Sequence, residues 1–242
     1  MVGRAKIRLF VDDALAVGNS VPVGRDHSNY LFNVMRLKAG DRVSLFNGKD
    51  GEWQAEITAA GKRQGALRCL SQSAPLRMPP DLWLLFAPIK KARTDFIVEK
   101  AAEMGVARIV PVQTAFTNSE RIRQDRLQAH AIEAAEQCGG TFVPEVSELL
   151  KLSDLLTDWD LDRRLMFCDE TRAGGVSTLD PNATGPWAIL IGPEGGFSDD
   201  ERDRLHAMDY TTVVSLGPRI LRADTAAVAA LTLWQSTLGD WR

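Results

Sequence analysis

The alternation of apolar runs with helical segments after residue 79 limits the possible folds of this chain more than any other feature of its sequence. Residues 82–87 (LWLLFA) form a continuous apolar run of the kind found in strands that are buried on both faces. Further strands are expected at residues 106–112, 165–168, 187–191 and 211–216, and helices at residues 94–104, 123–138, 198–208 and 224–238. Strands that alternate with helices fold into an α/β domain with a mostly parallel sheet, which we expect for residues 79–242.

Local signals mark the ends of several of these helices. Thr94 is expected to cap the first helix, and Gly105 to end it. Ser198 and Glu201 have the spacing of a capping box, in which each side chain accepts a hydrogen bond from the other residue's backbone N–H. This capping box predicts a helix that opens at Ser198 and runs to about Met208.

The chain before residue 73 has a different pattern. Residues 42–46 and 52–57 have the composition of strands, and the turn-forming sequence NGKDG between them predicts a hairpin. The following stretch, residues 73–80 (SAPLRMPP), holds three prolines within six residues and is typical of a connector. We therefore expect a small, mainly β barrel or sandwich over residues 1–73 and a separate domain over residues 79–242.

Charge is unevenly divided between these two parts. Residues 1–78 carry twelve Lys and Arg and seven Asp and Glu, whereas residues 79–242 carry seventeen and twenty-five. A basic small part beside an acidic large part is typical of a binding module attached to a catalytic one, although an uneven division by chance is an open alternative.

Composition excludes several classes of protein. Hydrophobic residues make up 45% and charged residues 25% of the 242 positions, as in folded soluble proteins. The three cysteines lie far apart, which argues against a disulfide framework or a zinc knuckle and favours a reducing, cytoplasmic location. Asp12 and Asp13 interrupt the apolar start, so we expect no signal peptide, and no run is long enough to span a membrane.

Two glycine-rich loops are the strongest candidates for a ligand site. In parallel α/β sheets, ligands bind at the carboxyl ends of the strands. Residues 191–197 (IGPEGGF) and 216–225 (LGPRILRADT) each follow directly after an expected strand. Glycines allow the backbone to approach a ligand closely, and the second loop places Arg219, Arg222 and Asp224 next to the start of a helix. A plain turn with a helix cap is the alternative for either loop alone.

Other common motifs are absent. The sequence has no GxGxxG after the first expected strand, no GxxxxGK[ST] and no GxSxG. The three histidines lie in separate segments without the spacing of metal ligands, so no metal site is expected.

Several motifs together resemble the bacterial 16S ribosomal RNA N3-uridine methyltransferases, a family of the SPOUT superfamily of knotted S-adenosylmethionine-dependent enzymes. The most specific are IGPEGGF at residues 191–197 and LGPRILR at residues 216–222. Weaker matches are HSNY at 27–30, VMRLKAGD at 34–41, FNG at 46–48, EKAAEMGV at 99–106 and EAAEQCG at 133–139. The resemblance covers most of the chain. One position departs from it, because the family usually has Glu where this chain has Asp224.

The resemblance implies a PUA-like β-barrel at the amino terminus and a SPOUT α/β domain with a trefoil knot. It also implies a homodimer that acts on the small ribosomal subunit, with S-adenosylmethionine as methyl donor and S-adenosylhomocysteine as product, and without a metal. The expected reaction is methylation of N3 of a uridine, uridine 1498, in 16S ribosomal RNA.

The resemblance also suggests which residues form the active site. We expect Arg222 to stabilise negative charge on the uracil carbonyl oxygens, and either Asp224 or Glu194 to act as the base. A salt bridge of Arg222 at the helix end, with Asp224 or Glu194, is the structural alternative. The residues expected at the cofactor are Leu190, Ile191, Gly192, Pro193, Glu194, Gly195, Gly196, Leu216, Gly217, Ile220, Leu221, Arg222, Thr225 and Ala226.

Basic side chains of the first part are expected to contact RNA phosphates. These are Arg4, Lys6, Arg8, Arg36 and Lys38. Three other functions stay open at this point: a SPOUT methyltransferase with a different RNA substrate, a nucleotide-dependent enzyme that acts on small molecules, and a non-catalytic RNA-binding or ribosome assembly factor. Binding of S-adenosylmethionine would separate the enzyme from the assembly factor.

Overall fold

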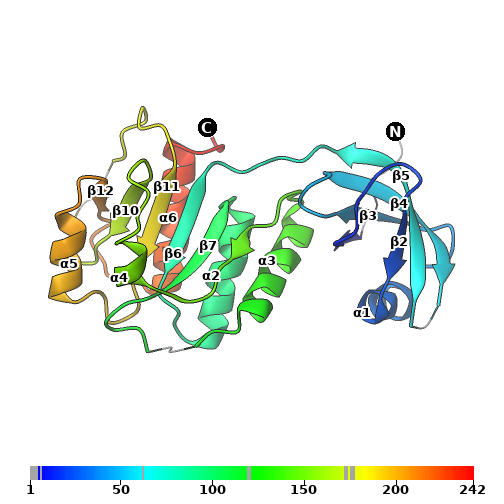
Figure 1. The fold of residues 1–242 in the computed structure, drawn as a ribbon, viewed down its shortest axis with the longest axis horizontal. Coiled ribbons are helices and arrows are strands. Elements are labelled where there is room, and N and C mark those ends of the chain that lie inside the picture. The colour runs from blue at the N-terminus through cyan, green and yellow to red at the C-terminus, as the bar shows by residue number, and fades with distance from the viewer. Residues whose placement is uncertain (1–4, 6, 62, 119–120, 172–173, 175–177) are drawn as a thin grey trace. The chain divides into compact units, whose positions relative to one another are not determined.

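The chain folds into two units, which are described separately here. The structure is a computed structural model that describes residues 5, 7–61, 63–118, 121–171, 174 and 178–242. Unit 1 consists of residues 1–78 together with residues 135–143, and unit 2 of residues 79–134 and 144–242 (Figure 1).

Unit 1 is built on one mixed sheet. Its strand order is β1-β3-β4-β5-β2, in which β1 and β3 are parallel and the other pairs are antiparallel. The strands are β1 (Arg8–Phe10), β2 (Ser20–Val23), β3 (Arg42–Phe46), β4 (Glu52–Ala60) and β5 (Gly65–Ala74), with α1 (Arg25–Ser28) and the π-helix η1 (Asn29–Val34) between β2 and β3. The predicted hairpin of β3 and β4 is confirmed, whereas β1, β2 and the two short helices have no counterpart in the prediction.

Apolar side chains of all five strands form the core of unit 1. The core includes Leu9, Val21, Val43, Ile57 and Leu67, none of them more than 3% exposed. Cross-strand packing of β-branched and other apolar residues on one face of a sheet provides the main stabilisation.

Unit 2 is an α/β domain with a parallel sheet. The strand order is β12-β10-β11-β6-β7-β8, with β9 also paired to β7, and each pair in this sheet is parallel. The strands are β6 (Leu82–Phe86), β7 (Arg108–Gln113), β8 (Glu145–Val146), β9 (Leu150–Lys151), β10 (Arg164–Cys168), β11 (Trp187–Ile191) and β12 (Thr211–Val214). The predicted fold class of this part is therefore confirmed.

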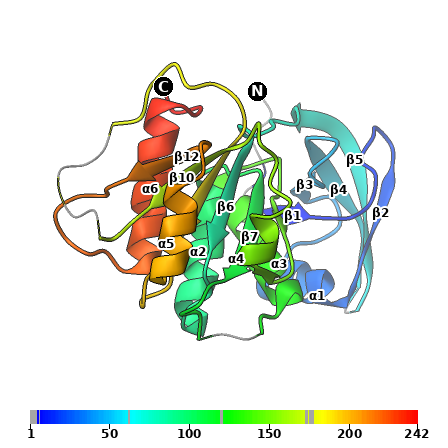
Figure 2. The ribbon, with the colours of Figure 1, turned by 60° about the vertical axis from the view of Figure 1, so that its left-hand side comes forward.

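Helices cover both faces of this sheet. They are α2 (Lys91–Glu103), α3 (Gln124–Cys138), α4 (Leu152–Leu155), α5 (Asp199–His206) and α6 (Ala223–Thr237). Helices α2 and α6 lie side by side on one face, as Figure 2 shows. On the other face, side chains from α4 and α5 join Leu85, Phe167 and Leu190 of the sheet in a buried cluster.

The start of α2 differs from the prediction. Lys90, not Thr94, is the residue before the helix, and Thr94 lies inside its first turns. The Thr94 hydroxyl is buried and bonds both the N–H and the carbonyl oxygen of Ile89, at 3.0 and 3.1 Å. Thr94 thus fixes the loop that enters the helix from a position inside the helix. The sequence does not distinguish this role from a helix cap, because threonine bonds nearby backbone groups in both.

Candidate active site

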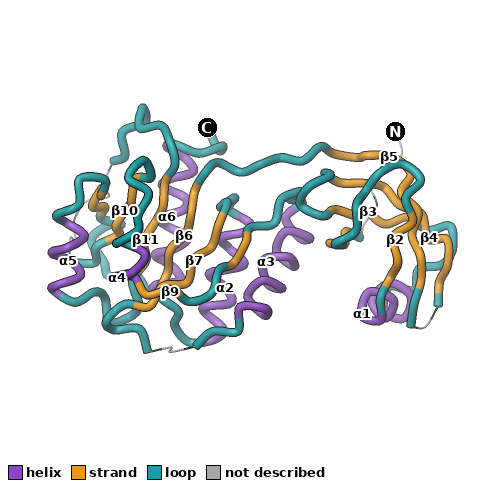
Figure 3. Tube along the Cα trace, viewed as in Figure 1, coloured by secondary structure: helices purple, strands orange, loops and turns teal. Residues whose placement is uncertain are grey.

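A cavity lies at the carboxyl ends of β10, β11 and β12. Because these three strands are parallel neighbours, the loops that follow them emerge at the same edge of the sheet (Figure 3). The cavity is lined by Cys168, Asp169, Glu170, Ile191, Gly192, Pro193, Glu194, Gly196, Val214, Ser215, Leu216, Gly217, Arg219, Ile220, Leu221, Ala223 and Ala226.

Glycine is required at two positions of the loop after β11. A Cβ atom on Gly192 would lie 2.6 Å from the ring of Phe197, which is 1% exposed and packs edge-on against Phe167. Gly196 has a φ of +69°, and a Cβ atom there would collide with the carboxylate of Glu170. Both glycines allow the loop to fold tightly against the end of β11 and leave its backbone groups at the cavity.

The loop after β12 forms the opposite wall. Gly217 has a φ of +118°, and its N–H donates to the Ser215 hydroxyl at 3.3 Å. Beyond it the side chains of Arg219 and Ile220 are exposed, and Ile220 is 79% accessible. Arg222 is the residue before α6 and has an extended backbone, with φ −67° and ψ 154°.

Asp169, which follows directly after β10, contributes a buried carboxylate to the cavity. Its side chain is 1% exposed and accepts hydrogen bonds from the N–H and hydroxyl of Thr171, at 2.9 and 2.7 Å. The Nε2 atom of His206 lies 2.9 Å away, and Arg202 forms an ion pair at 3.6 Å. Burial alone would raise the pKa of Asp169, but the bonds from Thr171 and His206 and the charge of Arg202 lower it below the ordinary value.

The other two residues of this segment have different roles. Cys168 is buried, and burial raises the pKa of its thiol to about 12, so it remains protonated at neutral pH and is a poor nucleophile. Glu170 forms an ion pair with Arg202 of α5. Residues 168–170 are not among the site residues predicted from the sequence. The polar residue that directly follows the apolar strand at 165–168 was a signal that could have indicated them.

The structure brings together most of the residues expected at the cofactor. Those that line the cavity are Ile191, Gly192, Pro193, Glu194, Gly196, Leu216, Gly217, Ile220, Leu221 and Ala226. Leu190, Gly195, Arg222 and Thr225 are not among the lining residues. Leu190 belongs to the core cluster on one face of the sheet, and Gly195 faces Phe116.

The three candidates for catalysis have distinct surroundings. Arg222 and Glu194 are exposed, and neither forms an ion pair within the part of the chain that the structure describes. The carboxylate of Asp224 is paired with Arg93 of α2, whose Nη1 lies 3.4 Å away. The alternative salt bridges of Arg222 with Asp224 or Glu194 are therefore not formed among the described residues.

The position of Arg8 does not agree with the prediction that it contacts RNA. Its side chain is 9% exposed and lies 2.6 Å from Glu52. Its other guanidinium nitrogens donate to the carbonyl oxygens of Ala135, Glu136 and Gly140, at 2.6–2.8 Å. Because these donors are already used inside unit 1, the residue has a structural role.

The other basic residues expected to contact RNA are placed differently. Arg36 and Lys38 are exposed, and Arg36, two residues after the end of η1, has a left-handed backbone with a φ of 58°. Arg4 and Lys6 lie outside the described residues. The described part of the chain contains no group of His, Cys, Asp and Glu side chains arranged to hold a metal ion. It also contains no helix that is both long and apolar enough to cross a bilayer.

Comparison with known proteins gives consistent matches along the chain. The profile of an RNA methyltransferase domain matches residues 77–235, and that of an RNA methyltransferase PUA domain matches residues 23–68. The ribosomal RNA small subunit methyltransferase E of Rickettsia conorii is 30% identical over 93% of both chains. Its counterpart in Bacillus subtilis is 27% identical over 84% of this chain and 85% of its own.

Two similar solved structures contain S-adenosylmethionine. One is a ribosomal RNA small subunit methyltransferase E from Neisseria gonorrhoeae, with a TM-score of 0.88 and 26% identity over 98% of this chain and 99% of its own. The other is a methyltransferase from Legionella pneumophila, with a TM-score of 0.87 and 28% identity over 98% of this chain and its own full length.

Proposed function

Because the chain belongs to the RNA methyltransferase family that includes the ribosomal RNA small subunit methyltransferases E, we propose that it methylates N3 of uridine 1498 in 16S ribosomal RNA with S-adenosylmethionine. The observation that supports this most directly is the cavity at the ends of β10, β11 and β12, which the two motifs of the sequence build together.

The cavity suits the cofactor of the similar structures. Its walls are apolar at Ile191, Leu216 and Leu221, which fits a flat adenine ring. Backbone groups of the two glycine-rich loops line the cavity and can bond the edge of such a ring, and the acidic Glu194 can bind hydroxyl or ammonium groups. When bound there, S-adenosylmethionine would supply an electrophilic methyl group.

We propose that Arg222 acts on the uracil ring. Methylation at N3 requires loss of the N3 proton, so negative charge develops on the two neighbouring carbonyl oxygens. An exposed guanidinium at the start of α6, beside the cavity wall formed by Ala223 and Ala226, can donate hydrogen bonds to those oxygens.

Asp224 and Glu194 remain the two candidates for the base. The pair with Arg93 holds the Asp224 carboxylate at the first turn of α6, whereas Glu194 is exposed at the cavity itself. Comparison of Asp224→Asn with Glu194→Gln at saturating S-adenosylmethionine assigns the role, since only the base variant should lose turnover steeply there. An Asp224→Glu variant, which restores the residue usual in the family, should stay active.

Unit 1 would bind the RNA backbone through exposed basic side chains such as Arg36 and Lys38. We propose a PUA-like RNA-binding domain over residues 1–73 and a SPOUT methyltransferase domain, with its trefoil knot, over residues 79–242. We further propose a cytoplasmic homodimer, for which light scattering should give about twice the chain mass of 26.6 kDa.

The decisive experiment uses labelled S-adenosylmethionine and small ribosomal subunits from cells that lack this protein, with nucleoside analysis of the digested 16S RNA. Labelled 3-methyluridine is the expected product. Label in another nucleoside would mean a methyltransferase with a different target, and cofactor binding without label would mean a different RNA. Absence of cofactor binding would instead favour a non-catalytic RNA-binding or assembly factor.

A further inference from the structure

A second cavity lies at the carboxyl ends of β6 and β7 in unit 2. It is formed by the loop that enters α2, the first turns of α2, the loop after β7 and the first turn of α3. Its described lining residues are Pro88, Ile89, Lys91, Thr94, Asp95, Arg121, Ile122, Arg123, Arg126 and Leu127, and we refer to it as the α2–α3 groove.

Positive charge dominates this groove. Four of its ten lining residues are basic, and Asp95 is the acidic one among them. The carboxylate of Asp95 is paired with Arg126 and lies 3.7 Å from His130, so it is already opposed by a cation. The first turn of α2 adds no acidic side chain, and the positive end of the helix dipole there favours an anion.

Lys91 offers its whole ammonium group to a ligand, whereas Arg123, which is paired with Asp125, offers Nη1 alone. Lys91 is exposed at the start of α2 and forms no ion pair within the described residues. Arg123 is 75% exposed, and Asp125 bonds its Nε and Nη2 at 3.0 and 2.8 Å. This pairing holds the guanidinium in one orientation while Nη1 keeps no hydrogen bond to the described residues.

The groove is physically joined to the candidate active site. The N–H of Ala87, at the end of β6, donates to the carbonyl oxygen of Ile191 at 3.0 Å. On α2, Arg93 pairs with Asp224 of α6. In the loop after β7, the N–H of Ala115 donates to Glu201 of α5 at 2.8 Å.

Phe116 is in the loop after β7, five positions before Arg121 of the groove, and lies against Gly195 of the loop after β11. It is 48% exposed although it is a large apolar side chain, and its Cβ atom would be 3.1 Å from a Cβ atom on Gly195. An exposed aromatic ring beside a basic groove is the usual arrangement for single-stranded RNA, because a base stacks on the ring while cations contact the phosphates.

We propose that the α2–α3 groove binds the RNA strand next to the target uridine. Lys91 and Arg123 contact phosphates, and Phe116 stacks on a flanking base. This assignment rests on the proposed function for its substrate class, RNA, and adds a binding track on the catalytic unit to the one expected on unit 1.

The salt dependence of RNA binding tests the phosphate contacts. Binding of the full chain to unmodified small subunits is measured by filter binding over a range of salt concentrations, for wild type and for Lys91→Gln, Arg123→Gln and the double variant. Each lost phosphate contact should make the slope of log K against log salt less negative by about 0.7–0.9.

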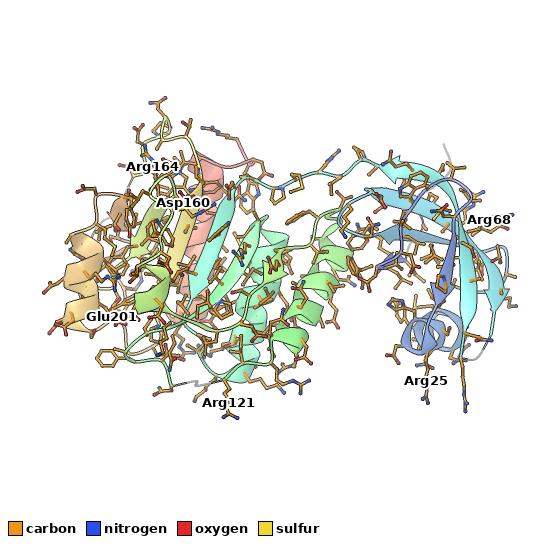
Figure 4. All side chains as sticks on the ribbon, viewed as in Figure 1. Arg25, Arg68, Arg121, Asp160, Arg164 and Glu201 are labelled. Carbon is orange, nitrogen blue, oxygen red and sulfur yellow. The ribbon has the colours of Figure 1, made fainter. Side chains whose placement is uncertain are left out.

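Arg164→Gln is the matched control. Arg164 is an exposed arginine of the same unit and begins β10, at the opposite edge of the sheet from the groove, as its position relative to Arg121 in Figure 4 shows. Its removal should leave the slope unchanged. Equal slopes for Arg164→Gln and the groove variants would overturn the proposal.

Kinetics separate RNA binding from the rest of the site. The double variant should raise KM for the subunit about tenfold or more and leave kcat and the affinity for S-adenosylmethionine within a factor of about two. Phe116→Leu, which loses the aromatic ring, should also raise KM for the subunit, whereas Phe116→Trp, which keeps one, should have a KM close to that of wild type. A loss confined to cofactor affinity would contradict the assignment.

The two proposals fail in different ways. Filter binding does not require turnover. If the groove variants change the salt dependence of RNA binding but wild type transfers no methyl group, the proposed RNA-binding groove stands and the proposed methylation target is refuted. If wild type transfers the methyl group but the groove variants have the wild-type salt dependence of RNA binding and the wild-type KM, the proposed function stands and the proposed groove is refuted.

Discussion

At the residue scale, three arginines show that the burial and contacts of a side chain decide whether it has a structural or a functional role. Arg8 is buried against Glu52, Arg93 holds Asp224, and Arg222 is exposed beside the candidate active site. In the sequence, Arg8 and Arg222 were both assigned to ligand binding, because a basic residue in a favourable stretch gives no sign of its burial. Only the fold shows that the carbonyl groups around Arg8 come from residues 135–140, more than 120 positions away.

Replacement of Arg222 tests the catalytic proposal. Arg222→Ala should lower kcat by about 100-fold or more, because a donor to the developing negative charge is lost. Since Arg222 is not among the residues that line the cavity, the dissociation constant for S-adenosylmethionine should change by less than about threefold. Calorimetry and single-turnover methyl transfer measure the two effects, and a variant with full turnover would contradict the role.

Replacement of Arg8 tests its structural role. Arg8→Ala should lower the free energy of unfolding by about 3 kcal/mol, because it removes the buried ion pair with Glu52 and the donors to three carbonyl groups. Urea denaturation measures the loss. Arg68→Ala is the control, since Arg68 is 56% exposed and its pair with Glu56 is long, at 3.9 Å. This variant should lower the free energy of unfolding by less than about 0.5 kcal/mol. Similar losses for both would argue against the buried pair.

Asp169 gives the protein a predictable dependence on pH. Because the folded protein lowers the pKa of this carboxyl, its ionised form stabilises the fold above the unfolded pKa of about 3.9, and this stabilisation is lost as pH falls through the lower folded value. Asp169→Asn should therefore be less stable than wild type at pH 7, and the difference should shrink below about pH 4. Urea unfolding of both proteins at several pH values measures this difference in the free energy of unfolding, and a difference that does not change with pH would contradict the role of the Asp169 charge.

At the scale of elements, local hydrogen bonding and burial decided which predictions were correct. The capping box of α5 is present as predicted: Ser198 accepts from the N–H of Glu201, and Glu201 accepts from the N–H of Ser198. The strand Trp187–Ile191 has the predicted bounds because all five of its residues are buried between neighbours. Thr94 was misplaced because its hydroxyl bonds Ile89, a contact that depends on the path of the preceding loop.

The capping box should contribute measurably to stability. Ser198→Ala removes the acceptor for the N–H of Glu201 and should lower the free energy of unfolding by about 1 kcal/mol. Ser236→Ala, an exposed serine within α6, should change it by less than about 0.5 kcal/mol. Thermal and urea unfolding of the two variants give the comparison, and an unchanged Ser198→Ala would mean that the box is not formed in solution.

At the scale of the whole molecule, the sequence predicted the architecture better than the site. The periodicity of residues 79–242 was enough for a parallel α/β domain, and the two glycine-rich loops do meet at one cavity. The third wall, Cys168, Asp169 and Glu170, was missed, because its place beside the other loops depends on the strand order. That order, with β10 between β11 and β12, is set by long-range pairing and leaves no pattern in the local sequence.

The discontinuity of unit 1 has a consequence for how the protein is made. Residues 135–143 complete this unit, and Val143 follows Met78 by 65 positions. At a translation rate of about 5–20 residues per second, the nascent chain extends for about 3–13 s after Met78 before the missing segment exists. Until then Arg8 can reach Glu52 but not the carbonyls of Ala135 and Gly140, so the first unit to begin synthesis must wait for β6, α2, β7 and α3 before it is finished.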